Sequence, residues 1–398
     1  MIHYFNPGHE TAVLNGSPFY QPPAQTVKMQ ADLAFLPAWY ADSEDYVLIN
    51  NPFPYLCRCS SFCRYMIDSQ RENIERIPLS SPAARAIGTE RVALWGISPQ
   101  SIHLFEKINR QYNLHFQTPA GSEEYREAAG RRTSQKALAL LIDEIPEIEK
   151  DILPQFFSTI DEIERYLLRS NEKQVVKSPF SSSGRGLVWL PPGKIAQSER
   201  QIISGMLKKQ SSVSIEKALD KQMDFSMHFE NTPEGETQFI GYSVFQTNGK
   251  GVYEKSLLAR QEDLEKRIAG FIDKALLLRV RKALNDFIHR LYIPHYTGNI
   301  GVDMLIYRSG NTYKLHPCVE INMRKSMGYL AIRLFEKHVH PDSQGELVIE
   351  YNPDPLTVGK KQKERLVCEN GQIKTGQLNL CPVSKTTKYY AHVKLTTL

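Results

Sequence analysis

A β-branched run that leads into a serine- and glycine-rich stretch is the feature that most constrains how this chain can fold. Gln174–Lys177 is followed by a loop that reads Ser-Pro-Phe-Ser-Ser-Ser-Gly-Arg-Gly, after which the apolar run Leu187–Leu190 begins. Two β-like runs joined by a loop of this composition predict a hairpin. Glycine lets backbone N–H groups approach a ligand closely, and serine hydroxyls add hydrogen-bond donors.

The positive charges at both ends of this loop favour phosphate binding. The candidate residues share an ability to donate hydrogen bonds to phosphate oxygens, and they are Lys177, Ser182, Ser183, Gly184, Arg185 and Gly186. The loop lacks the Gly-x4-Gly-Lys-Ser/Thr order that precedes the helix in a Walker loop. A flexible hairpin turn without a ligand is the alternative interpretation of the same stretch.

A second pattern, of acidic and amide residues, indicates a metal site. Asp303 lies in the β-like run Ile300–Tyr307, and a Ser-Gly-Asn turn leads to a second run that begins at Tyr313 and carries Glu320 and Asn322. Glu320 and Asn322 share one face of a strand because side chains alternate with a period of two, and Asp303 can face them across the hairpin. Two carboxylates and an amide oxygen are ligands that suit Mg²⁺. A solvated polar face is the alternative.

The first 125 residues predict a doubly wound α/β domain. Strands are expected at Ile2–Phe5, Tyr46–Asn50 and Arg91–Trp95. A helix is expected to begin directly after the third strand, since Ser98 suits the N-cap and Pro99 suits the first helical position, where a missing N–H costs nothing. Strand–loop–helix steps of this kind build doubly wound sheets.

The rest of the chain predicts an α+β domain over residues 126–345 and a small β extension over residues 346–398. Several further elements are expected: helices within 132–142, 162–168 and 277–291, strands at 238–246 and 252–258 joined by a loop that contains Asn-Gly, and a last strand at 389–393. Thr159 and Glu162 form a capping-box pattern before the second helix. The third helix carries apolar residues at helical spacing, so we expect it to pack on a sheet.

Composition limits the classes of function. The chain has 398 residues and a formal net charge of +5, without the clustered basic stripe of a nucleic-acid binder. The charge suits small anionic substrates. No apolar run approaches the ~18 residues of a transmembrane helix, and the N-terminus lacks a basic stretch followed by an apolar core. We therefore expect a cytoplasmic protein that binds neither nucleic acid nor membrane, and the sequence leaves a homo-oligomer open.

Three cysteines lie close together, at Cys57, Cys59 and Cys63. Three thiols within seven residues could form a metal or redox site. The C-x-C-x3-C spacing matches no common zinc pattern, and no fourth ligand is evident. Buried reduced thiols are the favoured interpretation, because free cysteine is often simply buried.

The phosphate loop and the acidic hairpin, in this order and separated by a hairpin and a helix, resemble the ATP-grasp superfamily over residues 130–327. In this resemblance Lys136 corresponds to the first ATP-binding lysine, although Gln135 stands where the family usually has Asp. Lys177 corresponds to the second lysine, and the loop after it to the loop that covers the phosphates. Glu216 lies in a segment similar to the linker that holds the adenine amino group, and Asp224 resembles the ribose-binding acid.

The resemblance extends to the residues expected to act on phosphate and substrate. Asp303, Glu320 and Asn322 match the metal ligands of the family. Lys255 matches a lysine that reaches the phosphates in one branch, and Arg324 stands in the place of an arginine that binds substrate or phosphate. Met323 stands where proline is usual, and the separation of the two acidic strands is somewhat long, which leaves the subfamily open.

The resemblance implies an ATP- and Mg²⁺-dependent ligase, with Mn²⁺ as an alternative metal. Such an enzyme activates a small carboxylate as an acyl phosphate, which an amine or similar nucleophile then attacks. Lys255 and Arg324 would be its catalytic residues. Two alternatives stay open: a small-molecule kinase on the same scaffold and a non-catalytic nucleotide-binding protein.

Three further residues are weaker candidates. His9 and Glu10 follow the first predicted strand, where N-terminal domains of this family often meet substrate. A surface turn is the more common reason for such residues. His316 precedes Glu320 and Asn322 on the second metal strand, and a lone histidine is more often a hydrogen-bonding neighbour than a metal ligand.

Overall fold

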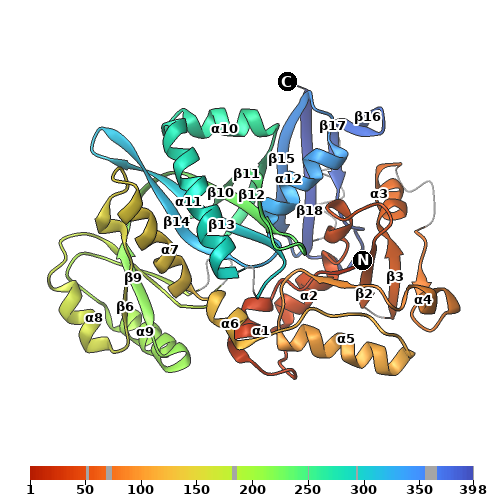
Figure 1. Ribbon diagram of the computed structural model, residues 1–398, viewed down its shortest axis with the longest axis horizontal. Coiled ribbons are helices and arrows are strands. Elements are labelled where there is room, and N and C mark those ends of the chain that lie inside the picture. Colours follow the sequence, from red (N-terminus) through yellow and green to blue (C-terminus); the bar gives the residue numbers. More distant parts are fainter. Residues whose placement is uncertain are drawn as a thin grey trace. The chain divides into compact units, whose positions relative to one another are not determined.

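The computed structural model describes residues 1–50, 53–68, 74–181, 186–249, 251–292, 295–354 and 365–397 (Figure 1). Its chain divides into two compact units. The first comprises Met1–Ser122, Glu254–Leu264 and Arg324–Leu398, and the second comprises Glu123–Tyr253 and Glu265–Met323. These limits differ from the expected boundaries at 125 and 345, because the chain returns to the first unit twice. Strand pairing, which sequence position does not reveal, brings those later segments back.

The first unit begins with a five-stranded sheet in the order β4-β3-β2-β1-β5. Its strands are β1 (Ile2–Tyr4), β2 (Tyr46–Asn50), β3 (Pro54–Arg58), β4 (Ile77–Pro78) and β5 (Val92–Leu94). Strand β1 pairs in parallel with both β2 and β5, whereas β3 and β4 are antiparallel additions. The three predicted strands are therefore present and adjacent, with their carboxyl ends at one edge.

Helices accompany this sheet along the first 122 residues. They are α1 (His9–Asn15), α2 (Ala24–Asp32), the 3-10 helix η1 (Leu36–Trp39), α3 (Cys59–Ile67), α4 (Pro82–Ile87) and α5 (Pro99–Tyr112). Helix α5 begins as predicted, with a capping box in which Ser98 accepts from the N–H of Ser101 and Pro99 occupies the first turn.

The remaining segments of the first unit form antiparallel strands and a helix. The strand order is β12-β15-β18-β17-β16. The bounds are β12 (Tyr253–Leu258), α12 (Met327–His338), β15 (Ser343–Tyr351), β16 (Val367–Glu369), β17 (Gln372–Asn379) and β18 (Tyr389–Thr397), and α10 (Gln261–Ala269) lies at the limit of this unit. Their apolar side chains join those of β2, η1 and α3 in one buried cluster. The segment after 346 is thus part of this core.

The second unit contains a four-stranded antiparallel sheet in the order β6-β9-β7-β8. It is built from β6 (Gln155–Phe157), α8 (Ile160–Leu167), β7 (Gln174–Lys177), β8 (Leu187–Leu190), α9 (Gln197–Gln210) and β9 (Val213–Lys217). Thr159 caps α8 and forms the predicted capping box with Glu162. Apolar side chains of α8 and α9 pack on the sheet around Val176 and Ile215. The predicted hairpin of β7 and β8 is confirmed.

A set of long antiparallel strands completes the second unit, in the order β14-β13-β10-β11. The elements are α6 (Glu123–Ala128), α7 (Arg131–Glu144), the 3-10 helix η2 (Lys150–Ile152), β10 (Asp220–Asn231), β11 (Thr237–Thr247), α11 (Lys274–Tyr292), β13 (Gly298–Ser309) and β14 (Thr312–Asn322). Helix α11 buries an apolar stripe that includes Leu277, Leu284 and Ile288 and contacts β10 and β11. Helix α7 contacts β14, and the Ile321 N–H donates to Ser134 Oγ at 2.9 Å.

Candidate functional site

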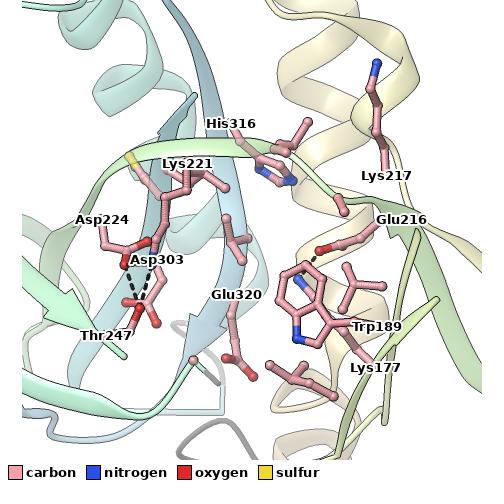
Figure 2. A pocket seen from close by; sticks show the side chains of 18 of the residues that line it. Lys177, Trp189, Glu216, Lys217, Lys221, Asp224, Thr247, Asp303, His316 and Glu320 are labelled. Atoms are coloured by element: carbon pink, nitrogen blue, oxygen red, sulfur yellow. Dashed lines mark hydrogen bonds and ion pairs between the residues drawn. The ribbon is translucent and has the colours of Figure 1, made fainter. Parts of the chain in front are cut away.

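A cavity of about 370 Å³ lies within the second unit (Figure 2). One wall comes from the four-stranded sheet and includes Val175, Leu187 and Trp189. The facing wall comes from the long strands and includes Leu305 and Val319. Pockets of this size, with apolar walls and a few converging polar groups, are typical of small-molecule sites.

An ion pair between Lys177 and Glu216 lies on one side of this cavity (Figure 2). Both residues are 8% exposed. They belong to paired strands, with Val175 opposite Glu216 and Lys177 opposite Ser214 in the register of β7 and β9. The alternation of side chains along these strands therefore brings a buried ammonium and a buried carboxylate to the same cavity.

Trp189 projects from β8 beside this pair and is 52% exposed (Figure 2). Such exposure is unusual for a large apolar side chain, and the Trp189 indole lines the cavity. Leu305 of β13 also lines the cavity. An aromatic ring and an aliphatic side chain in one cavity offer apolar contacts that suit a planar ring.

The acidic hairpin meets the same cavity as the sequence predicts. Asp303 and Glu320 are directly opposite each other in the register of β13 and β14, and both line the cavity. Ser226 Oγ donates to Asp303 Oδ1 and the Asn322 amide donates to Asp303 Oδ2, each at 2.9 Å. These contacts hold the Asp303 carboxylate in one orientation.

Two carboxylates and an amide on neighbouring strands form a set of hard oxygen donors, which fits Mg²⁺. Among the described residues, no three histidine, cysteine, aspartate or glutamate side chains lie close enough together to hold a metal ion by themselves. The Asn322 amide, which bonds Asp303, supplies the third group. The expected ligands Asp303, Glu320 and Asn322 are thus close together in the structure, and their metal role stays a prediction.

Arg131, at the first position of α7, supplies the cation that sequence reasoning missed. It is 6% exposed and lines the cavity. Its guanidinium donates to Glu320 Oε1 at 2.9 Å and to Ser181 Oγ at 3.4 Å, and its Nε donates to the Ser178 carbonyl at 3.2 Å. One arginine therefore connects the start of the phosphate-loop candidate to the acidic hairpin.

Lys136, the residue expected to be the first ATP-binding lysine, is exposed on α7. Helix α7 packs through the face that carries Arg131, Ser134 and Leu138, at spacings of three and four residues. Lys136 lies two residues beyond Ser134, about 200° around the helix. The signal for Arg131 was present in the sequence, since it precedes the apolar Leu138 by seven residues and shares its face.

Asp224, the residue expected to bind the ribose, lines the cavity. Its Oδ2 accepts from Lys221 Nζ at 2.6 Å and from Thr247 Oγ1 at 2.9 Å (Figure 2). Lys221 Nζ also donates to Thr247 Oγ1 at 2.6 Å. The three side chains form a small polar triangle with hydroxyl, ammonium and carboxylate groups, which could exchange hydrogen bonds with the hydroxyls of a sugar.

Most of the predicted phosphate loop, Ser182, Ser183, Gly184 and Arg185, lies outside the described residues. Its two ends are described. Ser181 lines the cavity, and Gly186 has a φ of +75°, in the region that favours glycine. The Ser178 N–H donates to the Gly186 carbonyl at 3.2 Å, which closes the base of the loop.

The two predicted catalytic residues, Lys255 and Arg324, belong to the first unit. Lys255 Nζ donates to Glu346 Oε1 at 2.7 Å. Arg324 Nε donates to Glu10 Oε1 at 2.5 Å, and Arg324 is largely buried. Each cation therefore has a carboxylate partner within its own unit.

Glu10 lies in a cluster at the carboxyl ends of β1 and β5. Burial opposes ionisation of this carboxyl, yet the charges of Arg324 and His9 outweigh it and lower the Glu10 pKa to about 2. The Asn6 side chain bonds both backbone groups of Gly96, which follows β5. A Cβ at Gly96 would lie 2.2 Å from the His9 ring, so only glycine lets the two loops approach so closely. The cluster lies where open α/β sheets bind ligands.

The grouped cysteines are buried free thiols. Burial raises the pKa of Cys57 to about 12, and it raises the pKa values of Cys59 and Cys63 further above the ordinary range. Such thiols are protonated at neutral pH and chemically inert. They form no metal-ligand cluster with other described residues.

Among the described helices, none is long and apolar enough to cross a membrane.

No protein-family model matches the sequence, and no curated protein matches it either. Solved structures do resemble the fold. The N5-carboxyaminoimidazole synthetase of Staphylococcus aureus, complexed with ADP, superposes with a TM-score of 0.50 over 100% of this chain and 92% of that chain, at 12% identity. Biotin carboxylase of Campylobacter jejuni, in a β-γ-ATP complex, has a TM-score of 0.49 over 79% of this chain and 72% of that chain, at 10% identity. At such identities the first of these likenesses shows a shared fold.

Proposed function

We propose that this chain, which has the ATP-grasp fold, is an ATP- and Mg²⁺-dependent ligase. It transfers the γ-phosphoryl group of ATP to a substrate carboxylate, and the resulting acyl phosphate is attacked by an amine or a similar nucleophile. One observation carries the proposal. Two buried cations, Lys177 and Arg131, and two carboxylates, Asp303 and Glu320, line one cavity of about 370 Å³.

The polar and apolar parts of the cavity match the parts of a nucleotide. Trp189 and Leu305 offer apolar contacts to the base, and Glu216 offers carboxylate oxygens to the base amino group. Asp224 and its neighbours would accept the ribose hydroxyls. Lys177 and Arg131 supply the positive charge that phosphate oxygens require. The S. aureus synthetase of the same fold was solved with ADP, which agrees with this assignment.

Asp303, Glu320 and Asn322 would hold Mg²⁺, whose charge neutralises phosphate oxygens and favours phosphoryl transfer. The chain's own groups have distinct tasks beside it. The Arg131 guanidinium, held by Glu320 and by the Ser178 carbonyl, presents a fixed positive charge. A donor that is already oriented needs no reorganisation when charge develops on the transferred group.

We assign Arg324 to the substrate carboxylate. It already binds a carboxylate, that of Glu10, in a largely buried setting. A substrate carboxylate would compete with Glu10 for Arg324, and His9 Nδ1 lies 3.1 Å from the Glu10 carboxylate that would be displaced. Glu10 and His9 then lie beside the substrate and help to select it.

The test is a screen of small carboxylates paired with amines, with separate measurements of ADP and inorganic phosphate. The proposal expects equal amounts of ADP, phosphate and a conjugate. A kinase would release ADP without free phosphate, and a non-catalytic binder would release neither. The Asp303→Asn variant is the control for contaminating ATPase and should lose the signal. Phosphate release that persists unchanged in this variant, or ADP without phosphate, would contradict the ligase assignment.

A further inference from the structure

His316 of β14 is a buried histidine that the proposed chemistry does not use. It is 2% exposed and lines the nucleotide cavity. Neither ring nitrogen makes a hydrogen bond to another described residue. A buried polar atom without a partner costs about 1–3 kcal/mol, so folded proteins rarely retain one. An imidazole with two such atoms on a cavity wall needs an explanation.

The position of His316 decides which part of a ligand it can meet. It stands opposite Leu305 in the register of β13 and β14, so it belongs to the wall that faces Trp189. Figure 2 shows its ring extending from β14 towards the side of the cavity that carries Glu216. The charges of both Glu216 and Lys177 act on it electrostatically. His316 and the carboxylate assigned to the base amino group therefore line the same cavity.

The ring is neutral in the folded protein. Burial lowers the His316 pKa to about 4, against the opposing effect of Glu216 and with the help of Lys177. A neutral imidazole has one N–H donor and one acceptor nitrogen. It can donate to a heterocyclic nitrogen without bringing a net charge beside the apolar side chains of Trp189 and Leu305.

We propose that His316 determines base specificity by donating a hydrogen bond to a purine ring nitrogen that flanks the 6-amino group, N1 or N7. This inference rests on the proposed binding of ATP in the cavity. The amino group donates to Glu216, and the neighbouring ring nitrogen accepts from His316. The His316 donor and the Glu216 acceptor together recognise the amino group of adenine and the ring nitrogen beside it. A 6-oxo purine would place a carbonyl oxygen against the Glu216 carboxylate, so it binds more weakly.

The proposed recognition of adenine by Glu216 and His316 also explains why position 316 carries a histidine and not an apolar residue. A phenylalanine ring has nearly the same shape and would leave no unsatisfied atoms. In the unliganded protein neither ring nitrogen bonds another described residue, and the bound base would supply a partner for one of them. Sites that hydrogen-bond a ligand group discriminate strongly against analogues without that group, because the protein atom is then left unpaired.

The experiment measures equilibrium binding of ATP, 1-deaza-ATP and 7-deaza-ATP with Mg²⁺ by isothermal titration calorimetry, without any second substrate. The wild-type protein is compared with His316→Phe, which keeps the ring shape, and with His316→Gln, which keeps a donor. His289→Phe is the matched control, because it makes the same substitution at an exposed position of α11 that does not line the cavity. Circular dichroism melting checks that each variant is folded.

The wild-type protein should bind one of the two deaza analogues about tenfold more weakly than ATP, which corresponds to about 1.4 kcal/mol. His316→Phe should bind ATP about tenfold more weakly and bind ATP and that analogue equally within a factor of two. His316→Gln should recover part of the discrimination, and His289→Phe should keep all of it. Wild-type and His316→Phe proteins with the same ATP-to-analogue ratios would overturn the role of His316 and leave ATP binding intact. A wild-type protein that binds no ATP would overturn the nucleotide site itself.

Discussion

The buried pair of Lys177 and Glu216 allows a quantitative test of how the cavity is built. Replacing Lys177 with Met leaves the Glu216 carboxylate without its cation, and replacing Glu216 with Leu leaves the ammonium without its anion. The double variant Lys177→Met with Glu216→Leu places two apolar side chains together. These three variants and the wild-type protein form a double-mutant cycle that isolates the energy of the pair.

The magnitude follows from burial. The two side chains are only 10% and 9% exposed, and breaking a pair at such depth typically costs about 3–5 kcal/mol. Both side chains also line a cavity, so water can approach and the low end, about 3 kcal/mol, is expected for each single variant. The double variant should lie within about 1 kcal/mol of the wild-type protein, because apolar replacements of a buried pair are often neutral.

Scanning calorimetry without nucleotide measures the effect, since it avoids the loss of ATP binding that all three variants share. For a unit of this size, a loss of about 3 kcal/mol lowers the Tm by roughly 6–12 °C. The double variant should recover most of that loss. A Tm for Lys177→Met within about 2 °C of wild type, or a double variant less stable than either single one, would show that this pair is not desolvated as the structure indicates.

Three further predictions concern other parts of the molecule. Glu320→Gln and Asn322→Ala should each lower ADP release by at least about 100-fold while leaving the circular dichroism spectrum near that of the wild-type protein, because the backbone hydrogen bonds of β14 do not depend on either side chain; near-normal turnover in either would remove that residue from the metal set. Trp189→Phe should lose most of the change in tryptophan fluorescence on adding ATP and Mg²⁺, since the other two tryptophans are buried; an unchanged signal would place the base elsewhere. Glu10, with a pKa of about 2 against an ordinary 4.5, stabilises the folded first unit at neutral pH, and this contribution of about 3 kcal/mol is lost as the pH falls from about 4.5 towards 2. Glu10→Gln should flatten acid unfolding in that range, and an acid transition identical to wild type would refute a charged pairing of Glu10 with Arg324.

Local patterns in the sequence were sufficient for the elements and for part of the site. The β-branched run at 174–177 and the turn at residues 309–311 each produced the expected hairpin. The two-residue spacing of Glu320 and Asn322 placed both near Asp303, because a strand permits no other arrangement of alternate residues. Helix starts at Ser98 and Thr159 were also predicted, since a cap depends on residues within one turn.

The choice among cations depended on packing that no local pattern contains. Arg131 and Lys136 lie on the same helix, and only the docking of α7 on β14 turns Arg131 into the cavity and leaves Lys136 exposed. Lys255 was expected at the phosphates on the basis of resemblance, yet its observed partner is Glu346, 91 residues away. Salt bridges between distant segments form only once the strands have paired.

Domain limits and the role of His316 were decided by tertiary structure as well. Strand β12 and the segments from Arg324 onward share a core with the first unit, so the division of the chain follows burial of apolar surface and not order along the sequence. The sequence makes His316 only a weak candidate, since such a histidine is usually a hydrogen-bonding neighbour, and only the structure shows both ring nitrogens without a hydrogen bond to another described residue. Sequence therefore determined what depends on neighbours within a few residues. Tertiary structure decided which side chains meet, because burial and hydrogen-bond satisfaction are properties of the whole packed chain.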